Sequence, residues 1–142
     1  MSRPTFQLSS VTRAFLTLPH TATLTTLRPD GTPHVTPVRF TFDAATGLVR
    51  VTTRAGSRKA RNVKAAGPAA RVALCQAEGI RWITLEGRAA VTHAPAHLAE
   101  AVRRYTVRYR ADPPTPLDLV SSRSPSTASW TSTSESPVPK AE

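Results

Sequence analysis

The sequence predicts a mainly β protein, an antiparallel β-barrel with two or three short helices. Short runs of alternating apolar and polar residues, rich in β-branched side chains, recur between residues 21 and 91. Turn-forming Pro, Gly and Asp residues separate these runs at close spacing. Strands and long helices do not alternate as a parallel α/β sheet would require, and 142 residues are enough for one core.

The N-terminal segment predicts a helix followed by a hairpin. Apolar residues recur at near-helical spacing from Phe6 to Leu18, which indicates a short amphipathic helix that ends at Pro19. The run Thr21–Leu27 is typical of a strand, and Arg28–Gly31 (RPDG) has the composition of a tight turn.

The strand that returns from this turn contains two prolines. Thr32–Phe42 alternates apolar and polar residues, but Pro33 and Pro37 cannot donate to a regular ladder, so we expect a bulged or edge strand. Leu48–Thr53 alternates as a half-buried strand does. The first part of the barrel is therefore predicted as three sequential antiparallel strands.

The second half of the barrel is predicted as a helix, two strands and a further helix. Ser57 can cap the start and Gly67 the end of a short helix between them. Strands are expected at Ala70–Gln76 and Arg81–Val91, and a helix with an apolar stripe follows from Pro95. The barrel domain is assigned to residues 1–114.

After residue 114 the composition changes. Residues 115–142 hold eight serines, four threonines and four prolines, with Trp130 as the only aromatic residue. Such a segment predicts a disordered tail.

The most unusual feature is a stretch of positive charge in a chain whose net charge is +10. Val49–Arg71 contains seven arginines and lysines and no acidic residue. A loop that leads into a helix start presents free N–H groups and a positive dipole end, so this stretch is a candidate phosphate seat. Its members are Ser57, Arg58, Lys59 and Arg61, with Asn62 able to brace the loop.

Two other interpretations of the basic stretch stay open. It could be a solvated face of a basic protein, or it could bind nucleic acid through counterion release. The nucleic-acid interpretation depends on charge alone, because the stretch lacks interleaved aromatic residues and recognition motifs. Nucleic acid is therefore not the expected partner.

The remaining residue patterns do not identify a catalytic or metal site. The sequence has no metal-ligand spacing that we interpret as a site, and no Ser-His-Asp or paired-carboxylate signature, so in an enzyme a bound cofactor would supply the reactive atom. Cys75 is the only cysteine and is predicted to be structural. Without a signal peptide or a long apolar run, we expect a cytoplasmic protein that does not enter a membrane.

Four blocks in order, TLRPDGTPHVTPVRFTFD, VRVTT, SRKARNV and RWITLEGRAAV, resemble the split β-barrel flavin and deazaflavin oxidoreductases, relatives of pyridoxamine 5'-phosphate oxidase. The similarity is strongest to the branch that uses coenzyme F420. It implies an FMN-binding-like split barrel and a homodimer whose cofactors lie between subunits, with the phosphate on the basic loop. By this resemblance Lys59, Arg61 and Asn62 lie near the phosphate and tail. Thr36, Pro37, Val38, Thr52 and Thr53 would line the ring, with Trp82 contributed by the partner subunit.

The resemblance implies an oxidoreductase that transfers a hydride between F420 and a small unsaturated organic substrate. FMN is the alternative cofactor, and a non-catalytic flavin or nucleic-acid binder is the alternative function. The basic stretch favours F420, because its phosphodiester and glutamyl tail carry more negative charge than FMN. Such proteins usually end in another apolar strand, and beyond Leu117–Val120 the sequence has nothing comparable. The expected barrel is therefore incompletely closed.

Overall fold

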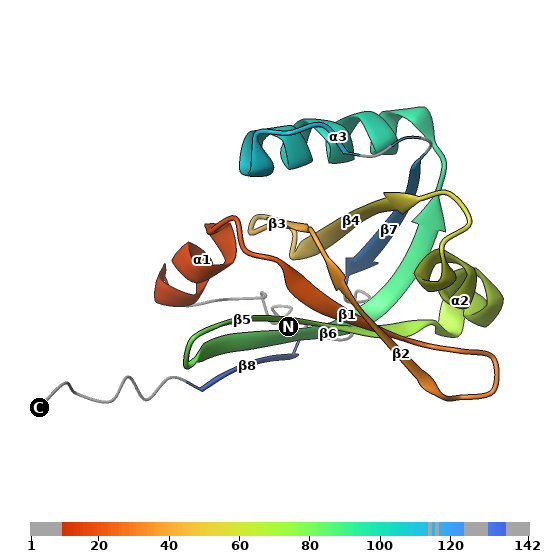
Figure 1. Cartoon of the computed structure of the whole chain (residues 1–142), viewed down its shortest axis with the longest axis horizontal. Coiled ribbons are helices and arrows are strands. Elements are labelled where there is room, and N and C mark those ends of the chain that lie inside the picture. The colour runs from red at the N-terminus through yellow and green to blue at the C-terminus, as the bar shows by residue number, and fades with distance from the viewer. Residues whose placement is uncertain (1–9, 114, 116, 124–130, 136–142) are drawn as a thin grey trace, which may run out of the picture.

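A computed structural model of the chain describes residues 10–113, 115, 117–123 and 131–135. The helices are α1 (Ser10–Thr17), α2 (Arg58–Ala66), α3 (Pro95–Tyr109) and the short 3-10 helix η1 (Gly67–Ala69). The strands are β1 (Ala22–Leu27), β2 (Pro33–Val38), β3 (Thr41–Asp43), β4 (Leu48–Arg54), β5 (Arg71–Glu78), β6 (Arg81–Thr92), β7 (Leu117–Arg123) and β8 (Thr131–Glu135). Figure 1 shows how they are arranged. None of the described helices has the length and apolar character that crossing a membrane requires.

The strands form one antiparallel sheet that curls into a barrel. Its order is β2-β1-β5-β6-β7-β4-β3, with β8 paired to β6 outside this path. Strands β2 and β3 end the path on opposite sides, yet only Arg39 and Phe40 separate them in the chain. The sheet must therefore curve until its two edges meet, which confirms the predicted antiparallel barrel.

One detail of the predicted topology is wrong. The expected three sequential antiparallel strands are two separate hairpins, β1–β2 and β3–β4, because the long strand predicted at Thr32–Phe42 breaks after Val38. Pro33 and Pro37 lie on the edge strand β2, as predicted, where they pair with Leu27 and Thr23. The break sends the chain across the barrel instead of along it.

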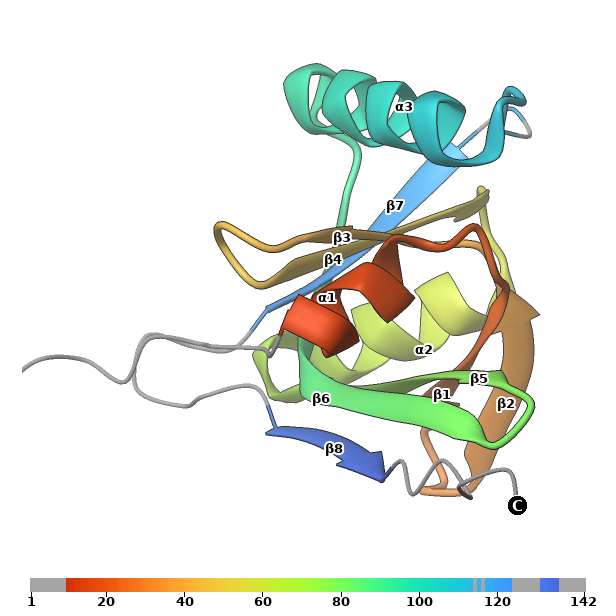
Figure 2. The same ribbon diagram turned by 90° about the vertical axis from the view of Figure 1, so that its left-hand side faces the viewer.

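The core fills the barrel, and two helices close its ends. On β4, Val49 and Val51 are buried inside the barrel, which fits the period of two in the sequence. In Figures 1 and 2, α1 lies at one end of the barrel and α2 at the other. Buried apolar side chains of both helices belong to the same core cluster, namely Phe15, Leu16, Ala60 and Val63.

The expectation of a disordered tail after residue 114 is wrong for two segments, which form strands β7 and β8. Residues 117–123 form β7, which pairs with β4 on one side and β6 on the other. Leu119 and Val120 are 1% and 2% exposed, and the Ser122 hydroxyl donates to the Arg88 carbonyl oxygen (3.0 Å). These two buried apolar residues suffice because the neighbouring strands satisfy the backbone hydrogen bonds of β7. The expectation of an incompletely closed barrel is therefore wrong, because β7 fills the position between β4 and β6.

The rest of the expected tail is only partly described. Strand β8 continues along the edge of β6 beyond β7, with Glu86 opposite Thr131 and Trp82 opposite Glu135. Residues 124–130 and 136–142 lie outside the described residues.

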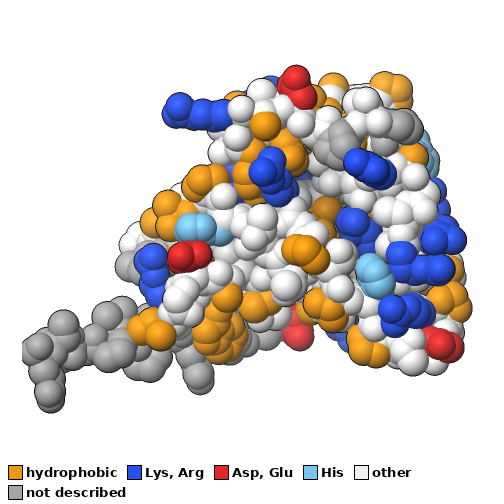
Figure 3. Space-filling model, in the orientation of Figure 1, with side chains coloured by type: hydrophobic (Ala, Val, Ile, Leu, Met, Phe, Trp, Pro, Cys, Tyr) orange, Lys and Arg blue, Asp and Glu red, His pale blue; other side chains and the backbone are white. Residues whose placement is uncertain are grey.

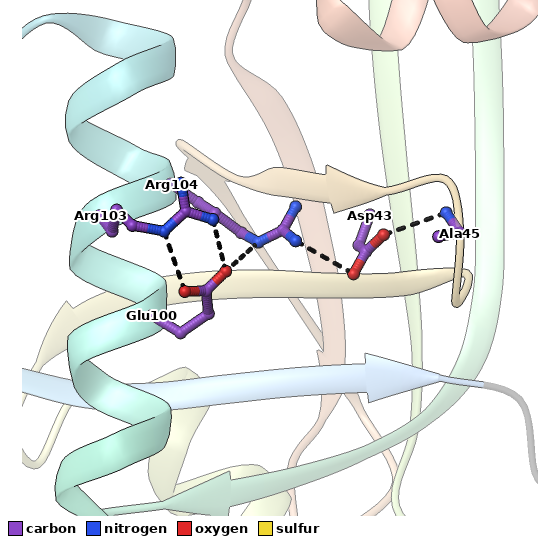
Figure 4. Close-up of polar contacts among 5 residues, drawn as sticks. All are labelled: Asp43, Ala45, Glu100, Arg103 and Arg104. Carbon is purple, nitrogen blue, oxygen red and sulfur yellow. Dashed lines mark hydrogen bonds and ion pairs between the residues drawn. The ribbon is translucent and has the colours of Figure 1, made fainter.

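Helix α3 is fastened to the outside of the barrel by a network of charges (Figure 4). Glu100 accepts from Arg103 and Arg104, and Arg104 also reaches Asp43 Oδ2 on β3 (3.2 Å). The hydrogen bonds from Arg103 and Arg104 lower the pKa of Glu100 to about 2. At the end of the helix, the Tyr109 hydroxyl accepts from the Phe40 N–H (3.0 Å) at the crossing between β2 and β3. These contacts fix the position of α3, which carries Tyr105.

Candidate cofactor site

A groove of about 330 Å³ lies where the C-terminal ends of β2 and β4 meet the start of α2 and the side of α3. Its floor and walls come from four segments that are distant in the sequence. The lining residues are Pro37, Val38, Arg39, Thr52, Thr53, Arg54, Ser57, Lys59 and Tyr105.

The loop between β4 and α2 shapes one end of the groove. The Thr53 hydroxyl donates to Ser57 Oγ (3.1 Å), and Ser57 Oγ also accepts from the Ala60 N–H (3.4 Å), so Ser57 is the predicted helix cap. The first intrahelical bond is donated by the Arg61 N–H to the Ser57 carbonyl oxygen (2.9 Å). The N–H groups of Arg58 and Lys59 precede this bond and lie at the positive end of the helix dipole. This end of the groove is suited to an anion.

Positive side chains add to the field of the helix. Burial lowers the pKa of Lys59, so its ammonium group is partly removed from water before any ligand binds. On β2, burial lowers the pKa of His34, and the nearby cations Arg28, Lys59 and Arg58 lower it further. Figure 3 shows the Lys and Arg side chains gathered on the side of the molecule that carries α2 and β2. The cluster favours a ligand with several negative charges.

Several buried polar atoms have no hydrogen-bond partner among the described residues, and two of them belong to residues in or beside the groove. One is Oγ1 of the lining residue Thr52, and the other is Nδ1 of His34 on β2, near the cations Arg28, Arg58 and Lys59. Buried polar atoms are usually paired, and exceptions often mark a ligand site. A ligand with both acceptors and donors along its edge suits this surface.

The structure brings six of the predicted site residues together. Pro37, Val38, Thr52, Thr53, Ser57 and Lys59 line the one groove, although they come from β2, β4 and the start of α2. They stay predictions as cofactor contacts, but their convergence is what such a site needs.

The other predicted residues lie outside the lining. Thr36 is half-buried one residue before the groove, and Arg58 and Arg61 are exposed on α2. Asn62 is buried and donates to Thr26 Oγ1 (3.0 Å), so it braces the helix against β1. Trp82 is half-buried on β6 and does not line this groove.

Three lining residues were not found from the sequence. Arg54 follows the predicted strand directly, but Arg39 and Tyr105 reach the groove through tertiary packing. The Arg39 guanidinium donates to the Tyr105 hydroxyl (3.0 Å) and lies 5.1 Å from the centre of the Tyr109 ring. The signal in the sequence that could have identified Arg39 is its charge within a predicted strand of alternating apolar and polar residues.

A second, larger cavity lies between α3 and the outer face of β4 and β7. It measures about 650 Å³, and its lining includes Asp43, Arg50, Arg88, Glu100 and Ser121. Acids and arginines are mixed there, and none of the predicted site residues lines it. Among the described residues, no group of three or more His, Cys, Asp or Glu side chains could hold a metal ion.

Comparison with known proteins identifies relatives that cover most of the chain. Residues 8–135 match the family described as pyridoxamine 5'-phosphate oxidase. The F420H(2)-dependent biliverdin reductase of Mycobacterium tuberculosis (strain CDC 1551 / Oshkosh) is 46% identical over 120 residues, which are 84% of this chain and 85% of the relative.

Solved structures share the fold. The conserved hypothetical protein Rv2991 from Mycobacterium tuberculosis superposes with a TM-score of 0.71 at 23% identity, covering 94% of this chain and 88% of that one. A structure described as F420 reductase gives a TM-score of 0.61 at 24% identity, covering 84% and 94% of the two chains.

Proposed function

Because the chain belongs to the pyridoxamine 5'-phosphate oxidase family, we propose that it is an F420-dependent reductase of a small unsaturated organic molecule. A linear tetrapyrrole such as biliverdin is the first candidate substrate. The observation that carries the proposal is the 46% identity to the F420H(2)-dependent biliverdin reductase over 84% of this chain. The proposed cofactor site is the groove at the start of α2.

The residues of the groove fit a deazaflavin with an anionic tail. Ser57, the N–H groups at the start of α2 and the partly desolvated Lys59 would hold the phosphate. Thr52, whose buried Oγ1 has no hydrogen-bond partner in the described part of the chain, and the backbone around Pro37 and Val38 would contact the edge of the ring. When bound, reduced F420 supplies a hydride.

The chain itself would bind and orient the reactants. Groups that hold two molecules in contact lower the barrier without a side-chain nucleophile. Arg39 is exposed at the groove and is positioned by Tyr105, so its guanidinium suits a carboxylate of the substrate. A proton for the product would come from a side chain or from water.

The proposal includes a homodimer. A groove of about 330 Å³ is at the small end of the range for ligand sites, which supports a site completed by a second copy. Leu27 and Val35 are 49% and 60% exposed on the β1–β2 hairpin and could contribute to the interface. In this arrangement Trp82 would reach the groove of the other copy. Sedimentation at several concentrations tests it, and a monomer throughout would contradict it.

We also propose that the protein is cytoplasmic. Cys75 is free and half-buried, which fits a reducing cytoplasm.

The function is tested by binding and turnover with defined molecules. The protein is titrated with F420 and with FMN, and it is then mixed without oxygen with reduced F420 and biliverdin. We expect tighter binding of F420 than of FMN, and oxidation of reduced F420 only when both protein and biliverdin are present. Tighter binding of FMN would contradict F420 as the cofactor. Binding of F420 without turnover would contradict biliverdin as the substrate.

A further inference from the structure

A buried carboxylate lies directly behind the loop that shapes the groove. Asp118 is 1% exposed, on the inner face of β7 opposite Thr53 of β4. Its Oδ2 accepts from the Gly56 N–H at 3.0 Å. The contact joins the loop before α2 to a strand 62 residues further along the chain.

Two basic side chains lie near the same carboxylate. Lys64 Nζ on α2 is 3.7 Å from Asp118 Oδ2, and His93 Nδ1 after β6 is 3.2 Å from Oδ1, although that second contact lacks hydrogen-bond geometry. Both partner side chains are about half exposed, at 46% and 59%. A buried charge with such partly exposed partners costs stability, and an apolar residue at the same place often would not. A role for Asp118 outside stability is therefore worth testing.

The hydrogen bond acts on the orientation of the loop. Gly56 has a positive φ of 77°, a conformation that fixes the direction of the N–H between Ala55 and Ser57. The same turn is closed by the Ser57 N–H, which donates to the Arg54 carbonyl oxygen (3.1 Å). Fixing Gly56 therefore fixes where Ser57 and the first turn of α2 point.

We propose that Asp118 is a positioning residue of the groove, which holds the Arg54–Ser57 loop in the orientation that receives the anionic end of the ligand. This inference rests on the proposed function for the identity of that ligand. Asp118 does not contact the ligand, because its carboxylate faces the loop from the barrel side. Its negative charge would, by itself, weaken anion binding, so geometry and charge have opposite effects.

The test separates these two effects with two substitutions. Asp118→Ala removes both the acceptor and the charge, whereas Asp118→Asn removes the charge and keeps an oxygen for the Gly56 N–H. Asp112→Ala removes a charge from an exposed position and serves as the control. If Asp118→Ala has a much lower melting temperature than the wild type, Asp118→Leu is used instead of it, because leucine fills the space without providing an acceptor.

Two ligands distinguish positioning from general loss of structure. One is F420, and the other is its chromophore without the phosphate and tail. Asp118→Ala should lower the affinity for F420 by about tenfold or more, because losing a hydrogen bond to a charged group has effects of that size. It should lower the affinity for the chromophore by less than about threefold. Asp118→Asn and Asp112→Ala should stay within about threefold of the wild type for both.

A measurement without cofactor completes the test. The amide resonance of Gly56 should shift in Asp118→Ala and remain near its place in Asp118→Asn. Inorganic pyrophosphate should move the amide resonances of Ser57 and Lys59 in the wild type and not in Asp118→Ala. If the wild type bound no F420, the proposed cofactor would be wrong, and the pyrophosphate experiment would still decide on Asp118. Three results would each overturn the inference. The first is that Asp118→Ala weakens the binding of F420 and of the tail-free chromophore equally, and the second is that it leaves the affinity for F420 unchanged. The third is that the pyrophosphate shifts are absent from the wild type or unchanged in Asp118→Ala.

Discussion

Replacing Lys59 by methionine should weaken F420 binding strongly, because this substitution removes the charge and keeps a side chain of similar length. An ammonium and a phosphate about 4 Å apart attract each other by about 4 kcal/mol at an effective dielectric constant near 20. Desolvation and lost rotamer freedom reduce this, and charge-assisted hydrogen bonds contribute a net of about 1.5–3 kcal/mol. Lys59 is half-buried at the groove, and burial has already lowered its pKa, so part of its desolvation precedes binding. We expect affinity to fall about tenfold to a hundredfold.

Fluorescence titration of F420 measures this difference. Arg71→Met is the matched control, since Arg71 is exposed at the start of β5 and does not line the groove. Both variants lose one positive charge, so a general effect of net charge would weaken them equally. The phosphate seat would be refuted by Lys59→Met and Arg71→Met showing the same affinity.

Further predictions concern stability. Val120→Ala should lower the free energy of unfolding in urea by about 1.5–3 kcal/mol, because Val120 is buried in the barrel. Val107, which is 71% exposed on α3, is the control, and Val107→Ala should change the free energy of unfolding by less than about 0.5 kcal/mol. Equal effects of the two substitutions would contradict the position of β7 in the barrel. Asn62→Ala should cost about 1–3 kcal/mol by leaving the Thr26 hydroxyl unpaired, and no loss in urea unfolding would contradict the brace. The pKa of His34 is lowered by burial and by nearby cations, so its contribution to stability is present above its ordinary pKa of 6.5. That contribution is lost as the pH falls from this value through the lowered pKa of the folded protein. His34→Gln should therefore lose less melting temperature on acidification than the wild type, and parallel losses would oppose this.

Local sequence patterns predicted most of the elements because their causes are local. Ser57 and Gly67 mark the ends of α2 through their cap chemistry, and the period of two in Leu48–Thr53 places Val49 and Val51 inside the barrel. The family resemblance was confirmed by the match over residues 8–135 and by the 46% identical relative.

The features that the sequence did not predict depend on contacts between distant segments. Strand β7 has few apolar residues, but β4 and β6 satisfy its backbone on both sides, and no local pattern announces that pairing. Arg39 becomes a groove residue only because α3 crosses the barrel and brings Tyr105 beside it. Arg61 matched the basic motif, yet its place on α2 leaves it exposed and outside the groove lining.

A crystal structure of the protein with bound F420 would show whether the groove at the start of α2 holds the cofactor. We expect the phosphate within hydrogen-bond distance of Ser57 and Lys59, with the ring beside Thr52 and the segment from Pro37 to Val38. F420 bound instead in the larger cavity between α3 and the outer face of β4 and β7, or F420 whose phosphate faces away from α2, would contradict it.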